Sequence, residues 1–131
     1  MGDDEFLAAF EACTIPKADW THEAHVRMAW LYLSRFPFAD ALHRVRTGIQ
    51  RYNLSLGNTT GYHDTITVAF VRVIAHRRQA GEGYTAFRER HPDMLDRKLP
   101  ALLRYYTEAR LKSAEATERF IEPDREPLPT V

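Results

Sequence analysis

The sequence has a single cysteine, Cys13, no excess of either charge and no long apolar run. One cysteine excludes an intrachain disulfide and fits the reducing cytoplasm, where we expect the protein to act. Lys plus Arg and Asp plus Glu number 18 each. This balance argues against nucleic acid as a partner, because gripping phosphates needs a basic surface. No apolar stretch approaches the roughly 20 residues that cross a bilayer, and the acidic start lacks the pattern of a secretory signal. We therefore expect no membrane partner.

The composition is that of an ordinary globular protein, with 44% apolar and 27% charged residues among 131. This length suits one domain with a core of its own. We expect a single helical domain over residues 1–122. Residues 123–131 carry three prolines, so we expect an extended C-terminal tail there.

Apolar residues recur at helical spacing along most of the chain. The pattern predicts four main helices over 4–13, 22–34, 37–52 and 61–78, and shorter ones over 85–91, 100–106 and 108–120. Residues 65–74 are rich in β-branched side chains and would suit a strand, but the length of the segment favours a helix. The sequence thus predicts an all-α fold, a compact bundle of about four main helices plus two or three short C-terminal ones.

Polar residues and one glycine mark details of these helices. Side chains that suit helix caps precede three of the main helices. They are Asp3 or Asp4 for the first, Thr21 for the second, and Thr59 or Thr60 for the fourth. Gly48 lies beside the apolar stripe of 37–52, where its missing side chain suits close helix packing.

Three histidines lie at predicted helix starts. His22 and His25 are spaced i, i+3 on one face of the second helix, and His63 begins the fourth. Short connections make neighbouring helices antiparallel, so the second and fourth helices should run parallel with their N-termini at one end of the bundle. Glu11 should reach the same end, together with Tyr52 and Tyr62.

Three imidazoles and a carboxylate suit Zn²⁺, Fe²⁺ or Ni²⁺, and they leave coordination positions open. The sequence therefore predicts a mononuclear metal protein with His22, His25 and His63 as ligands. Such a site would suit a metal-dependent hydrolase or an oxygen-dependent enzyme. Glu11 would be a fourth ligand or a general base acting on metal-bound water. Tyr62 and Asp64 would orient the ligands, and Tyr52 and Trp20 would line the pocket.

Two other classes of function fit the same residues. The chain could be a non-catalytic helical module that binds a small organic ligand or a protein partner. Its pocket would then be lined by aromatic side chains, namely Trp20, Tyr52, Tyr62, Tyr105 and Tyr106. It could also be a purely structural or oligomer-forming domain.

Two short motifs suggest a family resemblance. Residues 20–25 read W-T-H-E-A-H and residues 62–67 read Y-H-D-T-I-T. These motifs, with the ending from Tyr105 to Pro129, resemble a W-T-H-x-x-H and Y-H-x-T-[IL]-T pattern of small uncharacterised bacterial all-α proteins. The resemblance implies a common fold and carries no established activity. Three-histidine helical bundles of the DinB-like group offer a looser analogy, but their histidines have a different order and spacing.

Overall fold

The computed structural model describes residues 1–131, and every regular element in it is a helix. Eight elements are α-helices, five of them seven residues or longer, and there is no strand. The predicted all-α fold is therefore confirmed. Contacts along the chain group it into two compact units, Met1–Tyr62 and His63–Val131. That residues 1–122 fold as one domain stays a prediction.

The first unit contains three α-helices and one 3₁₀ turn. They are α1 (Asp3–Glu11), η1 (Lys17–Asp19), α2 (His22–Arg35) and α3 (Phe38–Ser55). The hydroxyl of Thr21 accepts a hydrogen bond of 3.2 Å from the N–H of Ala24, which confirms the predicted cap of α2. Pro37 directly precedes α3 and fixes the backbone angle at the turn between α2 and α3.

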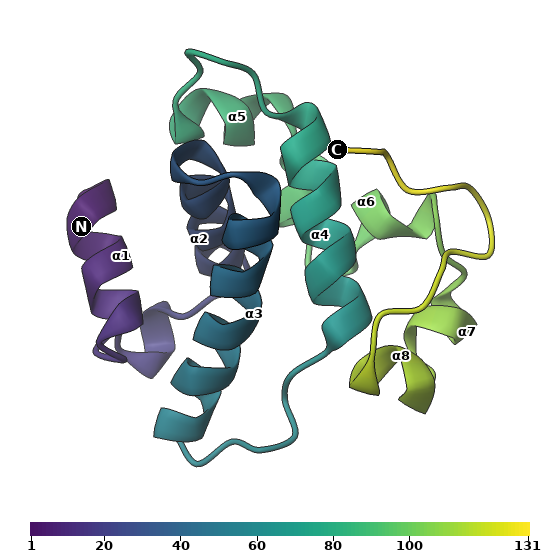
Figure 1. Ribbon diagram of the computed structural model, residues 1–131, viewed down its shortest axis with the longest axis horizontal. Helices are drawn as coiled ribbons and strands as arrows, with labels where there is room; N and C mark the ends of the chain where they lie inside the picture. The colour runs from purple at the N-terminus through teal and green to yellow at the C-terminus, as the bar shows by residue number, and fades with distance from the viewer. The chain divides into compact units, whose positions relative to one another are not determined.

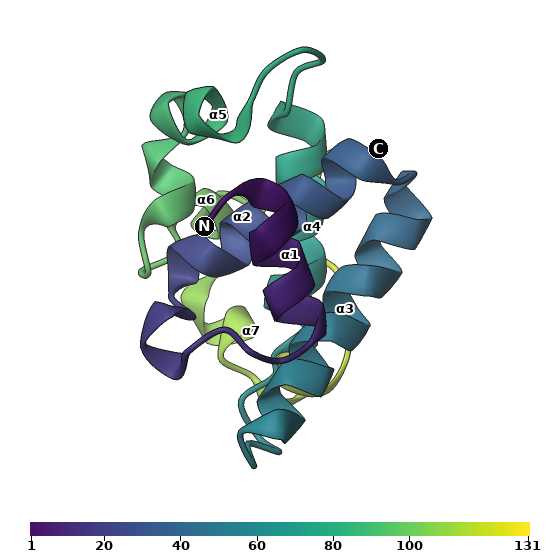
Figure 2. The same cartoon turned by 90° about the vertical axis from the view of Figure 1, so that its left-hand side faces the viewer.

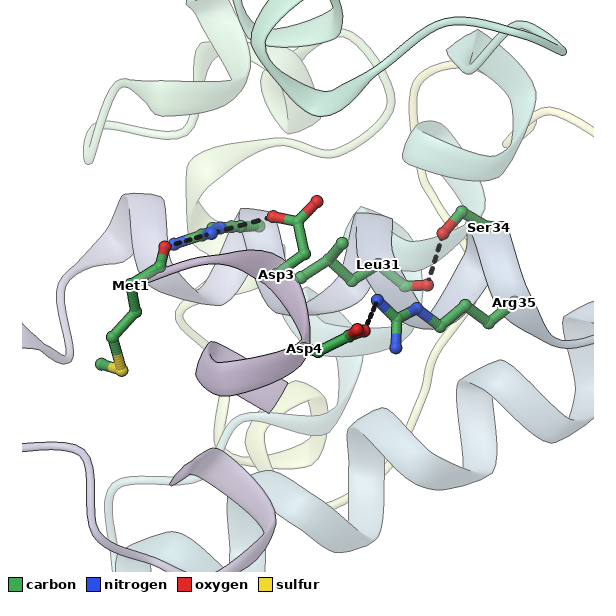
Figure 3. Close-up of polar contacts among 7 residues, drawn as sticks. Met1, Asp3, Asp4, Leu31, Ser34 and Arg35 are labelled. Carbon is green, nitrogen blue, oxygen red and sulfur yellow. Dashed lines mark hydrogen bonds and ion pairs between the residues drawn. The ribbon is translucent and has the colours of Figure 1, made fainter. Parts of the chain in front are cut away.

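Helix α1 crosses α2 (Figure 2), and two ion pairs join its first turn to α2 (Figure 3). Asp3 pairs with Arg27 at 2.8 Å, and Asp4 pairs with Arg35 at 2.6 Å. Neither aspartate caps α1, which has no side-chain cap, so that prediction is wrong. Because the pairs are partly or fully exposed, each stabilises the fold little. Their main effect is to fix where the first turn of α1 lies on α2.

The contact between α1 and α3 depends on Gly48. A Cβ atom at this position would lie 2.5 Å from Cε2 of Phe10, whose ring is fully buried. The ring therefore occupies the space that any larger residue at Gly48 would need. The predicted close packing at Gly48 is confirmed.

The second unit is arranged around one long helix. Its elements are α4 (Asp64–Arg77), α5 (Tyr84–Arg90), η2 (Pro92–Leu95), α6 (Pro100–Leu103), α7 (Glu108–Leu111) and α8 (Ala114–Glu118). Helix α4 contacts both α6 and α8 (Figure 1). The β-branched run 65–74 is helical, as predicted. Most of its side chains are buried, and burial outweighs the small helix preference of such residues.

Three predicted helix boundaries in this unit are wrong. The helix expected over 100–106 ends at Leu103, and two others differ for a shared reason. The helix expected over 108–120 is interrupted, because the hydroxyl of Ser113 accepts the N–H of Ala116 at 3.1 Å and starts a new helix, α8. The fourth helix begins after His63 rather than after Thr59 or Thr60. At Ser113 and at His63 a polar side chain hydrogen-bonds to the backbone of its own segment. The spacing of apolar residues does not predict such bonds.

The C-terminal residues 123–131 contain no helix and lie against the second unit. The carboxylate of Asp124 accepts from the N–H and the hydroxyl of Thr107 at 2.8 and 2.6 Å. The N–H of Arg125 donates to the carbonyl of Tyr105 at 2.9 Å. Leu128 is buried. No helix in either unit has the length and apolar character needed to cross a membrane.

Candidate functional site

His22 and His25 lie in the first turn of α2, where the sequence placed them. Nδ1 of His25 lies 2.7 Å from the carbonyl oxygen of Thr21. Because a carbonyl can only accept, Nδ1 carries the proton and donates this hydrogen bond. The imidazole also lies against the indole of Trp20, with ring centroids 4.0 Å apart. Burial lowers the pKa of His25, and the neighbouring His22 lowers it further. His25 is therefore held as a neutral ring within an aromatic cluster.

Both ring nitrogens of His63 are already used. Nδ1 accepts the N–H of Ile66 at 3.1 Å, which makes His63 the N-cap of α4. Nε2 lies 2.7 Å from the carbonyl oxygen of Leu111, to which it donates. A metal ion bound to either nitrogen would break one of these bonds. His63 is thus a structural residue that joins the start of α4 to α7.

The two residues after His63 bind the segment that follows α8. The carboxylate of Asp64 accepts from the N–H of Phe120 at 3.1 Å. The hydroxyl of Thr65 donates to the carbonyl of Arg119 at 2.8 Å and accepts from the N–H of Ile121 at 3.1 Å. We call His63, Asp64 and Thr65 the α4 brace. The H-D-T part of the second sequence motif therefore has a structural explanation.

The predicted metal function is wrong. No group of three or more histidine, cysteine, aspartate or glutamate side chains lies so that it could hold a metal ion. His22 and His25 belong to the first unit and His63 to the second. Glu11, the predicted fourth ligand or base, instead accepts the hydroxyl of Tyr32 at 2.9 Å. The structure therefore has no group of ligands for the predicted Zn²⁺, Fe²⁺ or Ni²⁺ ion, and the ligand and base roles predicted around that ion do not apply.

The aromatic residues of the alternative prediction are mostly core residues. Tyr52 and Tyr106 are fully buried, and their hydroxyls donate to the carbonyls of Ile15 and Ile121, each at 2.7 Å. Burial raises the pKa of Tyr106 to about 12. Tyr105 is also buried. Trp20 packs against Tyr52, with the two rings tilted and their centroids 5.0 Å apart. Tyr62, at the end of the first unit, is half-buried.

A pocket of about 520 Å³ opens in the first unit, and the sequence did not predict it. We call it the α1–α3 pocket, because α3 supplies most of its wall, α1 contributes one residue and α2 another. It is lined by Glu11, Tyr32, Asp40, His43, Arg44, Thr47 and Arg51. Its volume lies in the usual range for small-molecule sites, roughly 300–1,000 Å³. Its lining is unusually polar for such a site.

Some of the charged side chains in the α1–α3 pocket form an ion pair and others do not. Nε of Arg44 donates to Asp40 at 3.0 Å, and its guanidinium lies 3.9 Å from the ring centre of Phe36. This pair neutralises one cation and one anion. Arg51 and Glu11 line the same pocket and take part in no ion pair. An unpaired guanidinium and an unpaired carboxylate therefore face one solvent-filled space.

Tyr32 lies in the wall of the same pocket and bonds to Glu11. It is buried apart from its access to the pocket, and its hydroxyl donates to Glu11 at 2.9 Å. Burial raises the pKa of Tyr32 well above its usual value, the bond to Glu11 raises it further, and Arg51 and Arg44 act in the opposite direction. The hydroxyl stays protonated at every physiological pH, so it is a fixed donor.

One signal in the sequence could have revealed this pocket. Asp40, Arg44, Thr47 and Arg51 follow each other at spacings of three and four residues, which places them on one face of α3. Such a polar stripe usually indicates a solvated helix face. What makes it a pocket is the position of Glu11 and Tyr32, and that depends on how α1 and α2 pack.

Comparisons with known proteins add no further guide to this site. No family model matches the chain, and no curated protein sequence or solved structure is significantly similar to it. The resemblance of its two motifs to small bacterial helical proteins stays a prediction.

Proposed function

We propose that the protein binds a small organic acid, a carboxylate or a phosphate monoester, in the α1–α3 pocket. The observation that carries the proposal is the unpaired guanidinium of Arg51 in a pocket that already contains the guanidinium of Arg44. Small-molecule binding was one of the alternatives that the sequence left open. The aromatic site considered there is replaced by a polar one.

The chemistry of arginine supports an acidic ligand. A guanidinium presents its N–H groups as a fork that matches the two oxygens of a carboxylate or a phosphate. Arg44 keeps donors beyond the Nε that it gives to Asp40. Because the pocket is open to solvent, screening limits the gain from each contact. We therefore expect a dissociation constant of about a millimolar for a minimal acid.

Titration of the folded protein with valerate and with butyl phosphate, followed by two-dimensional NMR, tests this proposal. Residues of the α1–α3 pocket should shift in a saturable way with at least one of these acids. Arg51→Gln should weaken the binding about tenfold, since it removes a charge-assisted contact. The two acids also distinguish a carboxylate ligand from a phosphate ligand.

Arg97→Gln is the matched control, because Arg97 is an exposed arginine of the second unit and does not line the pocket. It changes the net charge as Arg51→Gln does and should leave the binding unchanged. Equal weakening by both variants would indicate a general charge effect and contradict the proposal. Failure of both acids to shift any pocket residue would also contradict it.

The cellular setting was predicted from the sequence alone. We retain the cytoplasm as the place of action and exclude nucleic acid as a partner on the ground of the balanced charge. Both statements are part of the proposal.

A further inference from the structure

We infer that the ligand of the α1–α3 pocket is a zwitterion, a molecule that carries an ammonium group as well as its acid group. This inference rests on the proposed function and adds a second contact to it. The acid group would bind Arg51, and the ammonium group would bind the carboxylate of Glu11. The juxtaposition of these two unpaired and opposite charges in one pocket carries the inference.

Other charges near the pocket are already neutralised. Asp40 accepts from Arg44, and the two form an ion pair at 3.0 Å. The two arginines of α2, Arg27 and Arg35, pair with Asp3 and Asp4 (Figure 3). Among these charged groups of α1, α2 and α3, Glu11 is the carboxylate that keeps its charge for a ligand.

The carboxylate of Glu11 can accept further hydrogen bonds beside the one from Tyr32. A carboxylate can accept about four hydrogen bonds, and Tyr32 supplies one of them, to Oε1. Since Tyr32 remains protonated, this bond holds the carboxylate in one place without neutralising it. Oε2 is left for an ammonium group, which donates up to three hydrogen bonds.

Arg51 and Glu11 line the same pocket and form no ion pair with each other. Nη2 of Arg51 lies near the contact between α1 and α3, 3.7 Å from where a Cβ atom of Gly48 would be. Cε2 of Phe10, the residue before Glu11, lies 2.5 Å from the same position. Arg51 and the residue next to Glu11 therefore meet at one contact between α1 and α3, and Arg51 and Glu11 form no ion pair with each other. A ligand with two opposite charges can bridge them.

The test uses acids with and without an amino group, at three chain lengths. β-Alanine, γ-aminobutyrate and δ-aminovalerate are the zwitterions, and propionate, butyrate and valerate are their counterparts. The best zwitterion should bind about tenfold more tightly than its counterpart, because it gains a second charge-assisted contact. Glu11→Gln should abolish this preference, because it removes the partner of the ammonium group, while the simple acid should still bind through Arg51.

Glu5→Gln is the matched control, because Glu5 is an exposed carboxylate on the same helix and outside the pocket. It should preserve the preference. If simple acids bind through Arg51 and no zwitterion binds more tightly, the inference is overturned and the proposed function stands. If the preference persists in Glu11→Gln, the assignment of the ammonium site to Glu11 is overturned. If no acid or zwitterion binds, both the inference and the proposed function are overturned.

Discussion

Nε2 of His63 lies 2.7 Å from the carbonyl oxygen of Leu111, 48 residues further along the chain. With Nδ1 of the same ring on the backbone of α4, one side chain joins two helices of the second unit. The residue that the sequence suggested as a metal ligand is therefore a structural link.

His63→Ala should lower the free energy of unfolding by about 1–3 kcal/mol, because it removes a helix cap and leaves a carbonyl without its donor. Thermal or urea unfolding measures the change. His76→Ala is the control, since His76 is an exposed histidine in the last turn of the same helix, and it should change stability by less than about 0.5 kcal/mol. A fall in the melting temperature of the wild-type protein on adding a chelator would contradict the structural role.

Gly48→Ala should destabilise the first unit despite the better helix preference of alanine. The new methyl group would meet the buried ring of Phe10, and overpacking of this kind costs about 1–3 kcal/mol. The gain in helix preference is only about 0.5–1 kcal/mol. Urea unfolding measures the difference.

Phe10→Leu in the same chain gives a second check on the Gly48 contact. If the ring causes the clash, the two substitutions together should cost less than the sum of their separate effects. Gln50→Ala, at an exposed position of α3, should be nearly neutral. Strictly additive effects of Gly48→Ala and Phe10→Leu would show that the ring does not limit the side chain at position 48.

Acidification should destabilise the protein through His25. Its pKa is lowered from 6.5 in the folded state by burial and by His22, so below pH 6.5 the unfolded chain binds the proton more readily. The stability due to neutral His25 is thus complete above pH 6.5 and is lost as the pH falls through the lower folded value. Free energies of unfolding between pH 7 and pH 5 should fall less steeply in His25→Gln than in the wild-type protein. His76→Gln should keep the wild-type slope, and an unchanged slope in His25→Gln would contradict the prediction.

The sequence predicts the helices well where the apolar spacing is long and regular, as in α2 and α3. It predicts the cap at Thr21 because a threonine next to a helix start bonds within its own turn. It does not predict the break at Ser113, where a local hydroxyl bond outweighs a weak apolar pattern.

The functional residues were harder to predict for a different reason. The sequence places His22, His25 and His63 at helix starts, and this is correct. It does not say where their ring nitrogens bond, because partners such as Leu111 come from distant parts of the chain. The same holds for the α1–α3 pocket, where the stripe on α3 is visible but the approach of Glu11 and Tyr32 is not.

The α4 brace has a consequence for hydrogen exchange. The amides of Phe120 and Ile121 lie outside any helix, yet they donate to the buried side chains of Asp64 and Thr65. Amide protons exchange slowly when their acceptors are inaccessible to water, whatever the local secondary structure. These two amides should therefore exchange as slowly as those of a buried helix, and Thr65→Val should speed the exchange at Ile121. A segment that circular dichroism would count as coil would then be among the most protected parts of the second unit.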